Sequence, residues 1–462
     1  MMRNLKIHNF RLIFGLLLIT VSNNVIGQVN DTVPDLTAGF QSYRIDLETV
    51  LKLAGANNLT IKEFKTKQHL ATVDEKIARE WLIPKLFIGA SLHNLNGSAM
   101  NSDGKFFREV DRNSLWAGAG IGLNWIPGDG IYKVLAAKQN TIAFSYLLQA
   151  KKNEAILKAI LIFYDLQEKQ AEYETLTNLL KYTDRISRQL KIQVDIGQRY
   201  RSEYLLARSN YFNTWVALQE VIKNIHSISA ELTEVLTIED EDVLLLSSTN
   251  DVVPAELLDE QMITAELFDT AYSRRPELKY HQYLIEAQKF DQKRLTKGLL
   301  LPQLNLSLTD GRVGPFNGVP NNSPTDFTNR YENTFEFYAV VGWSIPLDVL
   351  ISGGQRKKAD ALIQLYQNRQ HQQKILIKKE ISQALSDYRE SKNQLQMAKE
   401  SSQFAEEALE QSTERQKLGM AKPFEVFQAQ EIYLKTMISY QSVVKNYNKA
   451  QYRLYVAMGN DL

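Results

Sequence analysis

The chain carries one pattern twice, and this repeat constrains its fold more than any other feature. The segment from Trp81, through Pro84, into an alternating strand is matched by the segment from Gly298 through Pro302. Trp125-Ile-Pro127 is matched by Ser344-Ile-Pro346, at nearly the same offset. Two turns, Gly197…Glu203-Tyr-Leu-Leu-Ala and Gly419…Glu425-Val-Phe-Gln-Ala, follow in the same order. Together they predict two copies of one unit, each reading helix, strand, loop, strand, very long helix, tight turn and helix.

This repeat predicts the domain organisation. The basic residues Arg3, Lys6 and Arg11 precede an apolar run of about ten residues and a small residue, Gly27, which is typical of a secretory signal peptide. An acidic stretch with Pro254 interrupts the helical pattern between the two copies. We therefore expect a signal peptide at 1–27, a first repeat at 28–237, an equatorial linker at 238–260 and a second repeat at 261–462.

Two segments in each repeat alternate between apolar and small or polar residues over unusual lengths. A strand of about ten residues that is apolar on one side, with aromatic residues near its ends, is typical of a transmembrane β-barrel. The alternative is a soluble sandwich strand, but four such strands among so many helical residues favour the membrane. The apolar sides are formed by Leu115, Ala117, Ala119, Ile121, Leu123 and Trp125, by Leu304, Leu306 and Leu308, and by Phe335, Phe337, Ala339, Val341 and Trp343.

Most of the remaining chain has a helical pattern. Residues 131–196 and 355–418 contain no proline, so each segment could form one helix of about 95–100 Å at 1.5 Å per residue. The segments that follow carry apolar residues at spacings alternating between three and four, which predicts coiled-coil packing of long antiparallel hairpins. Four strands cannot close a barrel, and open sheet edges are not tolerated in hydrocarbon. Two or more chains must therefore combine their strands.

The composition excludes several classes of function. The chain has no cysteine, so it forms no disulfide, thiolate zinc site or cysteine nucleophile. Its six histidines are scattered singly, and we expect no metal site, no cofactor and no enzymatic activity, because no catalytic constellation is present. With 54 Lys and Arg against 53 Asp and Glu, the chain lacks the basic excess of a nucleic-acid-binding protein.

Four features carry a resemblance to a known family: the repeat, the prolines at helix–strand junctions, Gly353-Gly354 after the fourth strand and the paired turn motifs. On these features the sequence resembles the TolC-type outer-membrane efflux protein family from about Ile45 to Gly459. The resemblance implies a homotrimer with a twelve-stranded β-barrel in the outer membrane and a long α-helical barrel in the periplasm. It also implies a passive exit duct for an inner-membrane pump, joined through a periplasmic adaptor (membrane fusion protein). The alternative is a periplasmic coiled-coil adaptor or scaffold without a pore.

The resemblance further implies roles for the two turns. They are the tips at which adaptors dock, and an acid six residues after each glycine lies near the closed periplasmic aperture. Gln428 stands where some family members carry a second acid. The alternatives are that the glycines serve only the helix-to-helix turns and that the glutamates are ordinary solvated residues. The docking residues are Gly197, Gln198, Arg199, Gly419, Met420 and Ala421, and the aperture residues are Glu203, Glu425 and Gln428.

Overall fold

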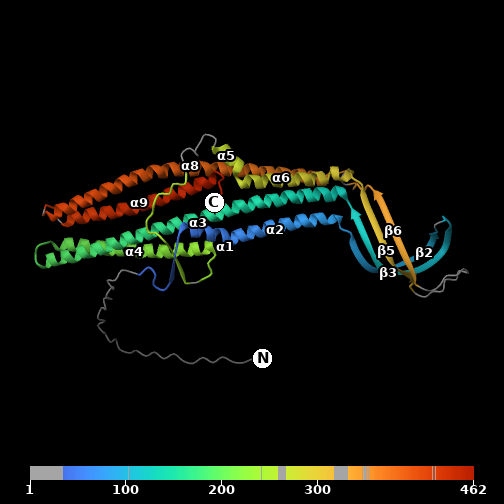
Figure 1. The fold of residues 1–462 in the computed structure, drawn as a ribbon, viewed down its shortest axis with the longest axis horizontal. Coiled ribbons are helices and arrows are strands. Elements are labelled where there is room, and N and C mark those ends of the chain that lie inside the picture. The colour runs from blue at the N-terminus through green and yellow to red at the C-terminus, as the bar shows by residue number, and fades with distance from the viewer. Residues whose placement is uncertain are drawn as a thin grey trace, which may run out of the picture. The chain divides into compact units, whose positions relative to one another are not determined.

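The computed structural model describes residues 35–101, 103–240, 242–258, 267–316, 331–345, 347, 351, 353–418, 420–421 and 423–462. The predicted signal peptide lies outside these residues. Chain contacts separate Met1–Leu36 from a second unit, Thr37–Leu462, which holds the elements described below. Its elements, in order, are β1 (Gln41–Ile45), α1 (Leu47–Asn57), α2 (Leu59–Arg79), η1 (Glu80–Leu82), β2 (Lys85–Met100), β3 (Phe106–Trp125), α3 (Pro127–Asp195), α4 (Arg201–Leu236), β4 (Val243–Ser247), α5 (Leu267–Arg274), α6 (Pro276–Arg294), η3 (Lys297–Leu300), β5 (Gln303–Pro315), β6 (Glu332–Gly342), α8 (Gly354–Lys417) and α9 (Pro423–Ala457) (Figure 1).

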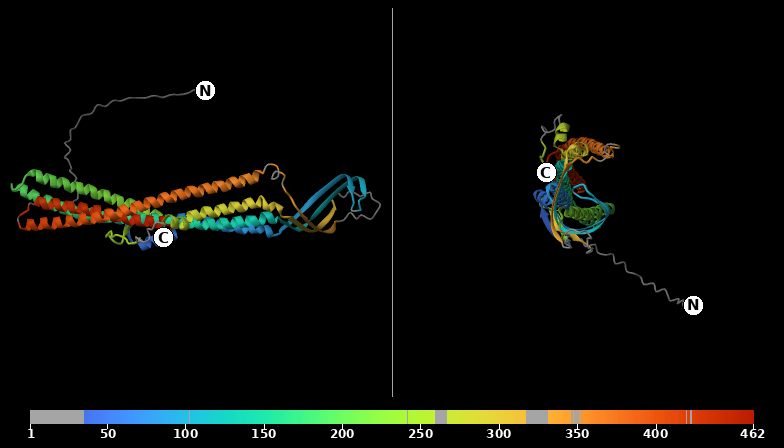
Figure 2. Two further views of the ribbon diagram at one scale, coloured as in Figure 1. Left: turned by 90° about the horizontal axis from the view of Figure 1, so that it is seen from above. Right: turned by 90° about the vertical axis from the view of Figure 1, so that its right-hand side faces the viewer.

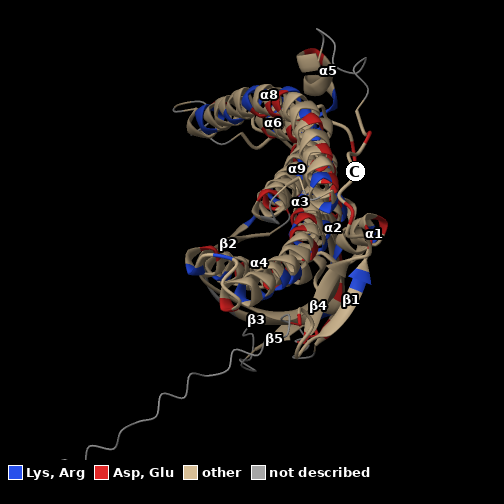
Figure 3. Ribbon diagram, turned by 90° about the vertical axis from the view of Figure 1, so that its left-hand side faces the viewer, with Lys and Arg blue, Asp and Glu red and all other residues tan. Residues whose placement is uncertain are grey.

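Two very long helices organise this unit, and the prediction of a mostly helical chain with a small β part is confirmed. α3 has 69 residues and α8 has 64, and each turns back into a shorter partner, α4 or α9. α3 contacts α2, α4, α6 and α9, while α8 contacts α6 and α9. Helices α2 and α4 thus lie one after the other along the length of the long helices, and so do α6 and α9 (Figure 1). Viewed end on, the helices form an open arc (Figure 3).

Apolar side chains hold each hairpin together. The seam predicted on the first return helix is buried at Leu218, Ile225 and Leu232, all fully inaccessible to solvent. On the second, Val444 and Leu454 are equally buried. Burying a leucine or isoleucine side chain contributes about 1.5–3 kcal/mol to the stability of the fold. These rows of buried apolar side chains, rather than helix propensity alone, therefore keep such long helices paired.

In both repeats, a side chain at the start of one helix donates a hydrogen bond to a carbonyl near the end of another helix. Asn58 caps α2 by accepting from Thr60 N at 2.9 Å, and its Nδ2 donates to Val235 O near the end of α4 at 2.8 Å. Arg275 precedes α6 and donates from Nη1 to Val456 O near the end of α9 at 3.4 Å. Because the last carbonyls of a helix lack intrahelical donors, these residues satisfy one helix end while beginning the next helix.

The linker between the repeats is an extended segment held by side-chain amides. Its strand β4 pairs in parallel with β1, a pairing that the sequence analysis did not predict. Beyond β4, Gln451 on α9 accepts from Leu257 N at 3.0 Å and donates to Ala255 O at 2.7 Å. Asn448, one turn earlier, donates to Val253 O at 2.9 Å. The predicted domain boundaries stay predictions.

Strands β2, β3, β5 and β6 form an antiparallel sheet in that order, at one end of the helices (Figures 1 and 2). The central pair, β3 and β5, joins the two repeats. A tryptophan in each repeat anchors the sheet to the helices: Trp125 Nε1 donates to Leu82 O at 3.4 Å, and Trp343 Nε1 to Leu300 O at 3.2 Å. The two tryptophans are offset by one residue from the sequence alignment, which matches Trp125 with Ser344. Where the repeats meet, a Cβ on Gly128 would collide with the backbone of Gly298, so only glycine fits there.

Candidate functional site

One face of the four-stranded sheet is apolar and exposed. The register aligns Leu86, Ile121, Leu308 and Phe337 in a single row across all four strands. The side chains of Leu86 and Phe337 are 71% and 63% exposed, and that of Ile88 is 80% exposed. A contiguous exposed apolar surface marks an interface with protein or lipid. The alternation predicted from sequence therefore gives one continuous apolar face.

The opposite face carries mainly small and polar residues, with the aromatic side chains of Phe87, Trp116 and Tyr338 among them. One of its rows joins Gly89, Gly118, Gly311 and Thr334, and another joins Gly122, Ser307 and Tyr338. Edges of β2 and β6 have no partner strand among the described residues. An apolar face, a polar face and two open edges are the properties of a barrel segment rather than of a closed sheet.

The two hairpin tips are built alike. Gly197 has φ +76° and donates to Val194 O at 3.0 Å, while Gln198 N donates to Gln193 O at 2.8 Å. These bonds form a Schellman motif, which favours glycine. In the second repeat Met420 N donates to Arg415 O at 2.8 Å, the bond equivalent to that of Gln198. Gly419 itself lies outside the described residues.

The residues predicted to dock a partner are mostly accessible. Gly197, Gln198 and Met420 are exposed, and Arg199 and Ala421 are half-buried. Exposed apolar side chains accompany them, at 60% for Ile196 and 74% for Leu418. Each tip thus exposes an apolar side chain beside its turn.

The three predicted aperture residues have different surroundings. Glu203 is half-buried and pairs with Arg199 at 3.4 Å. Glu425 and Gln428 are exposed on the first turns of α9. Glu203 lies on α4 of the first hairpin and Glu425 on α9 of the second.

An aromatic cluster behind the tips joins the two hairpins, and it was not predicted from the sequence. Phe427 of α9 stacks on Tyr182 of α3, with ring centroids 6.4 Å apart, and packs with Leu190 and Ala207. Burial raises the pKa of Tyr182, against the opposing effect of Arg185. Nearby, Asn210 Nδ2 donates to Glu431 at 3.1 Å. Phe427 lies inside the repeated turn motif, so its place beside Glu425 was the available signal.

Charged residues form a second link between the hairpins. Lys449 of α9 lies 2.6 Å from Asp165 of α3, and Lys445 lies 3.7 Å from Asp165 and 3.6 Å from the buried Glu168. Lys and Arg are interspersed with Asp and Glu on the helices (Figure 3). The three ion pairs connect α3 of the first hairpin with α9 of the second.

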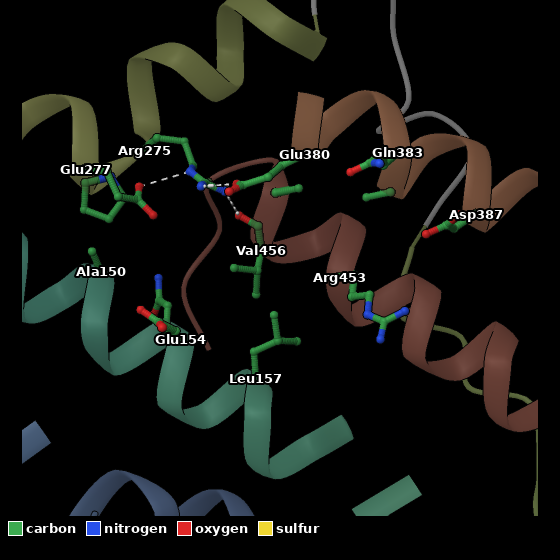
Figure 4. Close-up of a pocket in the computed structure, with 15 residues that line it drawn as sticks. Ala150, Glu154, Leu157, Arg275, Glu277, Glu380, Gln383, Asp387, Arg453 and Val456 are labelled. Carbon is green, nitrogen blue, oxygen red and sulfur yellow. Dashed lines mark hydrogen bonds and ion pairs between the residues drawn. The ribbon is translucent and has the colours of Figure 1, made fainter. Parts of the chain in front are cut away.

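A cavity of about 440 Å³ lies where α9 ends and α6 begins (Figure 4). Arg275, 5% exposed, lines it and contacts Glu277 at 3.0 Å and Glu380 at 2.6 Å. Its guanidinium is therefore already paired with two carboxylates of the protein. In the described part of the chain no group of acids and histidines could hold a metal ion, and no helix is long and apolar enough to cross a bilayer.

Comparison with solved structures defines the class of fold. The Campylobacter jejuni CmeC outer membrane channel shares it with a TM-score of 0.72 and 17% identity, covering 89% of this chain and 85% of that chain. CusC has a TM-score of 0.70 and 14% identity over 93% and 97%. The open state of the Neisseria gonorrhoeae MtrE outer membrane channel has 0.69 and 14% over 90% and 89%. The fold is that of outer membrane channels.

A family model matches part of the chain. Residues 267–460, the greater part of the second repeat, match the outer membrane efflux protein model. This match confirms the predicted family resemblance and the predicted outer-membrane localisation. The search of curated proteins finds no significant match.

Proposed function

We propose that the protein is the outer-membrane exit duct of a tripartite efflux or secretion system. The observation that carries this proposal is the four-stranded sheet, which has one exposed apolar face, one polar face and two unpaired edges. Three copies would close these edges into a twelve-stranded barrel, with the apolar faces toward lipid and the polar faces toward a lumen. The open arc of helices would form a third of a periplasmic tunnel (Figure 3).

The duct acts passively and catalyses no reaction. An inner-membrane pump supplies the energy, and a periplasmic adaptor joins pump to duct. The adaptor docks on the tips, at Gly197, Gln198 and Arg199 and at Gly419, Met420 and Ala421. The exposed Ile196 and Leu418 support this assignment, because they offer apolar surface beside the turns. The aperture is set by Glu425, with Glu203 and Gln428 as further residues near it.

Single cysteines in this cysteine-free chain test the orientation. Asp103 lies at the exposed β2–β3 turn and Gln198 at the α3–α4 tip. In intact cells, a bulky maleimide excluded by the outer membrane should label Asp103→Cys at once. It should label Gln198→Cys only after the outer membrane is permeabilised. If neither site reacts before permeabilisation, the strands do not cross the membrane, and a periplasmic scaffold is the better description.

A further inference from the structure

Two aromatic rings lie across the polar face of the sheet instead of standing away from it. Phe87 of β2 is paired with Gly120 of β3. A Cβ on Gly120 would contact the end of the Phe87 ring, with Cε1 at 2.7 Å. Because strand side chains normally stand roughly perpendicular to the sheet, this ring must lean sideways over the neighbouring strand. Glycine leaves the space that the ring occupies.

Trp116 of β3 also lies close to glycines. A Cβ on Gly118 would meet the backbone of β5, with Gly311 Cα at 2.6 Å, and the Trp116 ring, with Cζ2 at 2.7 Å. A Cβ on Gly311 would likewise meet Ala117 O at 2.6 Å and Trp116 Cε2 at 3.0 Å. The rings of Phe87 and Trp116 are 6.5 Å apart. Two large side chains on one face are thus accommodated by glycines on neighbouring positions, a pairing known to stabilise glycines in sheets.

From this geometry we infer that the Phe87–Gly120 pair sets the bore of the barrel for bulky cargo. The inference rests on the proposed function, which turns the polar face toward the lumen. With glycine at 120 the ring lies flat on the wall and the lumen stays wide. A side chain at 120 would force the ring to rotate into the lumen, and three copies would do so at one level.

Position 120 can be compared with a matched neighbour. Gly122 lies two residues further on β3 and on the same face, but a Cβ there meets nothing within 4 Å. Gly122→Ala therefore adds the same methyl group without moving a ring. Gly120→Ala also brings a Cβ to 2.8 Å from Leu308 O, so a backbone effect must be separated from a ring effect. The double variant Gly120→Ala/Phe87→Ala does this, because it keeps the backbone contact and removes the ring.

A thiol beyond the ring reports the local bore, independently of the periplasmic aperture. Ser307 pairs with Gly122, one row nearer the helices than Gly120, so a reagent from outside must pass Phe87 to reach it. Ser307→Cys in the full chain is the parent. The measurement is the ratio of its labelling rates in intact cells with a polyethylene-glycol maleimide and with N-ethylmaleimide.

We expect this ratio to fall in Gly120→Ala, to stay at the parent value in Gly122→Ala and to return to it in the double variant. An unchanged ratio in Gly120→Ala, or a low ratio that persists in the double variant, overturns the inference. If Gly120→Ala fails to assemble, the labelling ratio of the Phe87→Ala variant tests the inference instead. A ring that lies flat on the wall predicts a ratio close to that of the parent. A large rise in the ratio would mean that the ring already stands in the lumen, which overturns the inference.

Failure of the proposed function gives a different result. If the polar face does not line an outward-open lumen, the polymer reagent fails to label Ser307→Cys in the parent itself. The inference is then wrong together with the barrel. Labelling of the parent with no effect of Gly120→Ala contradicts only the role of Phe87.

Discussion

At the scale of single residues, each junction between two helices that meet end to end depends on one side chain. Asn58 is 7% exposed and serves two helices at once, as acceptor at the start of α2 and as donor at the end of α4. Asn58→Ala removes the cap and leaves Val235 O without its donor. We expect a loss of about 1–3 kcal/mol in the free energy of unfolding, measured by denaturant unfolding followed by circular dichroism. Asn57→Ala, one residue earlier, should be nearly neutral; equal losses would contradict the capping role.

A second residue, His281 of α6, predicts a pH dependence. Burial is the main cause that lowers its pKa, and nearby Arg369 lowers it further. The unfolded chain, with a histidine pKa of about 6.5, therefore binds the proton first as the pH falls. Neutral His281 therefore contributes fully to stability above pH 6.5. This contribution is lost as the pH falls below 6.5 toward the lowered pKa of His281 in the folded protein. The melting temperature of His281→Gln should fall less between pH 7.5 and 5.5 than that of the parent. The exposed His69→Gln should behave as the parent, and a His281→Gln curve parallel to the parent would refute the prediction.

At the scale of elements, the amide side chains on α9 hold the linker. Gln451 is fully buried, and Gln451→Leu removes its bonds to the backbone of Ala255 and Leu257. Each lost bond corresponds to about 1 kcal/mol, so hydrogen exchange at Leu257 should become about fivefold faster. Mass spectrometry of the peptide containing residues 252–258 measures this change. Gln430→Leu, nearer the tip of the same helix, is the control, and equal exchange in both variants would show that Gln451 does not hold the linker.

The elements also show what the sequence could predict. Both long helices begin and end close to the expected residues, because proline-free segments with seam spacing leave few alternatives. The apolar strand faces were predicted because alternation with a period of two depends only on local sequence. The β1–β4 pairing and the Tyr182–Phe427 stack were not, because each joins residues far apart in the chain whose local patterns are unremarkable. The roles of Glu203, Glu425 and Gln428 remain predictions.

At the scale of the whole molecule, the two faces of the sheet should respond differently to charge. Ile88 lies on the apolar face and Ser91 on the opposite face of the same strand. Ile88→Lys should destabilise the protein in lipid vesicles by about 2–4 kcal/mol, measured by unfolding in guanidinium chloride. Ser91→Lys should cost much less, since it faces water in the proposed lumen. Equal costs would contradict a lipid-facing surface.

The proposed aperture is also a property of the assembly. Three copies of the exposed Glu425 would meet around the tunnel axis, where cations or basic side chains can bridge the carboxylates, and removing these carboxylates should loosen the closed ring. Glu425→Ala should therefore raise the leak conductance of the protein in planar bilayers. Glu410→Ala, an exposed acid on α8, should leave the conductance at the parent value. Unchanged conductance in Glu425→Ala would exclude it as a gate.

The β1–β4 pairing has a consequence for how the chain acquires its structure. β1 lies at the start of the first repeat and its partner β4 lies in the linker after it, so this contact closes a loop that contains the entire first hairpin. Loop closure of this length is slow and entropically costly. β1 therefore pairs only when the first hairpin has brought β4 back to the start of the repeat. The two-stranded sheet thus ties the start of the first repeat to the linker that leads into the second.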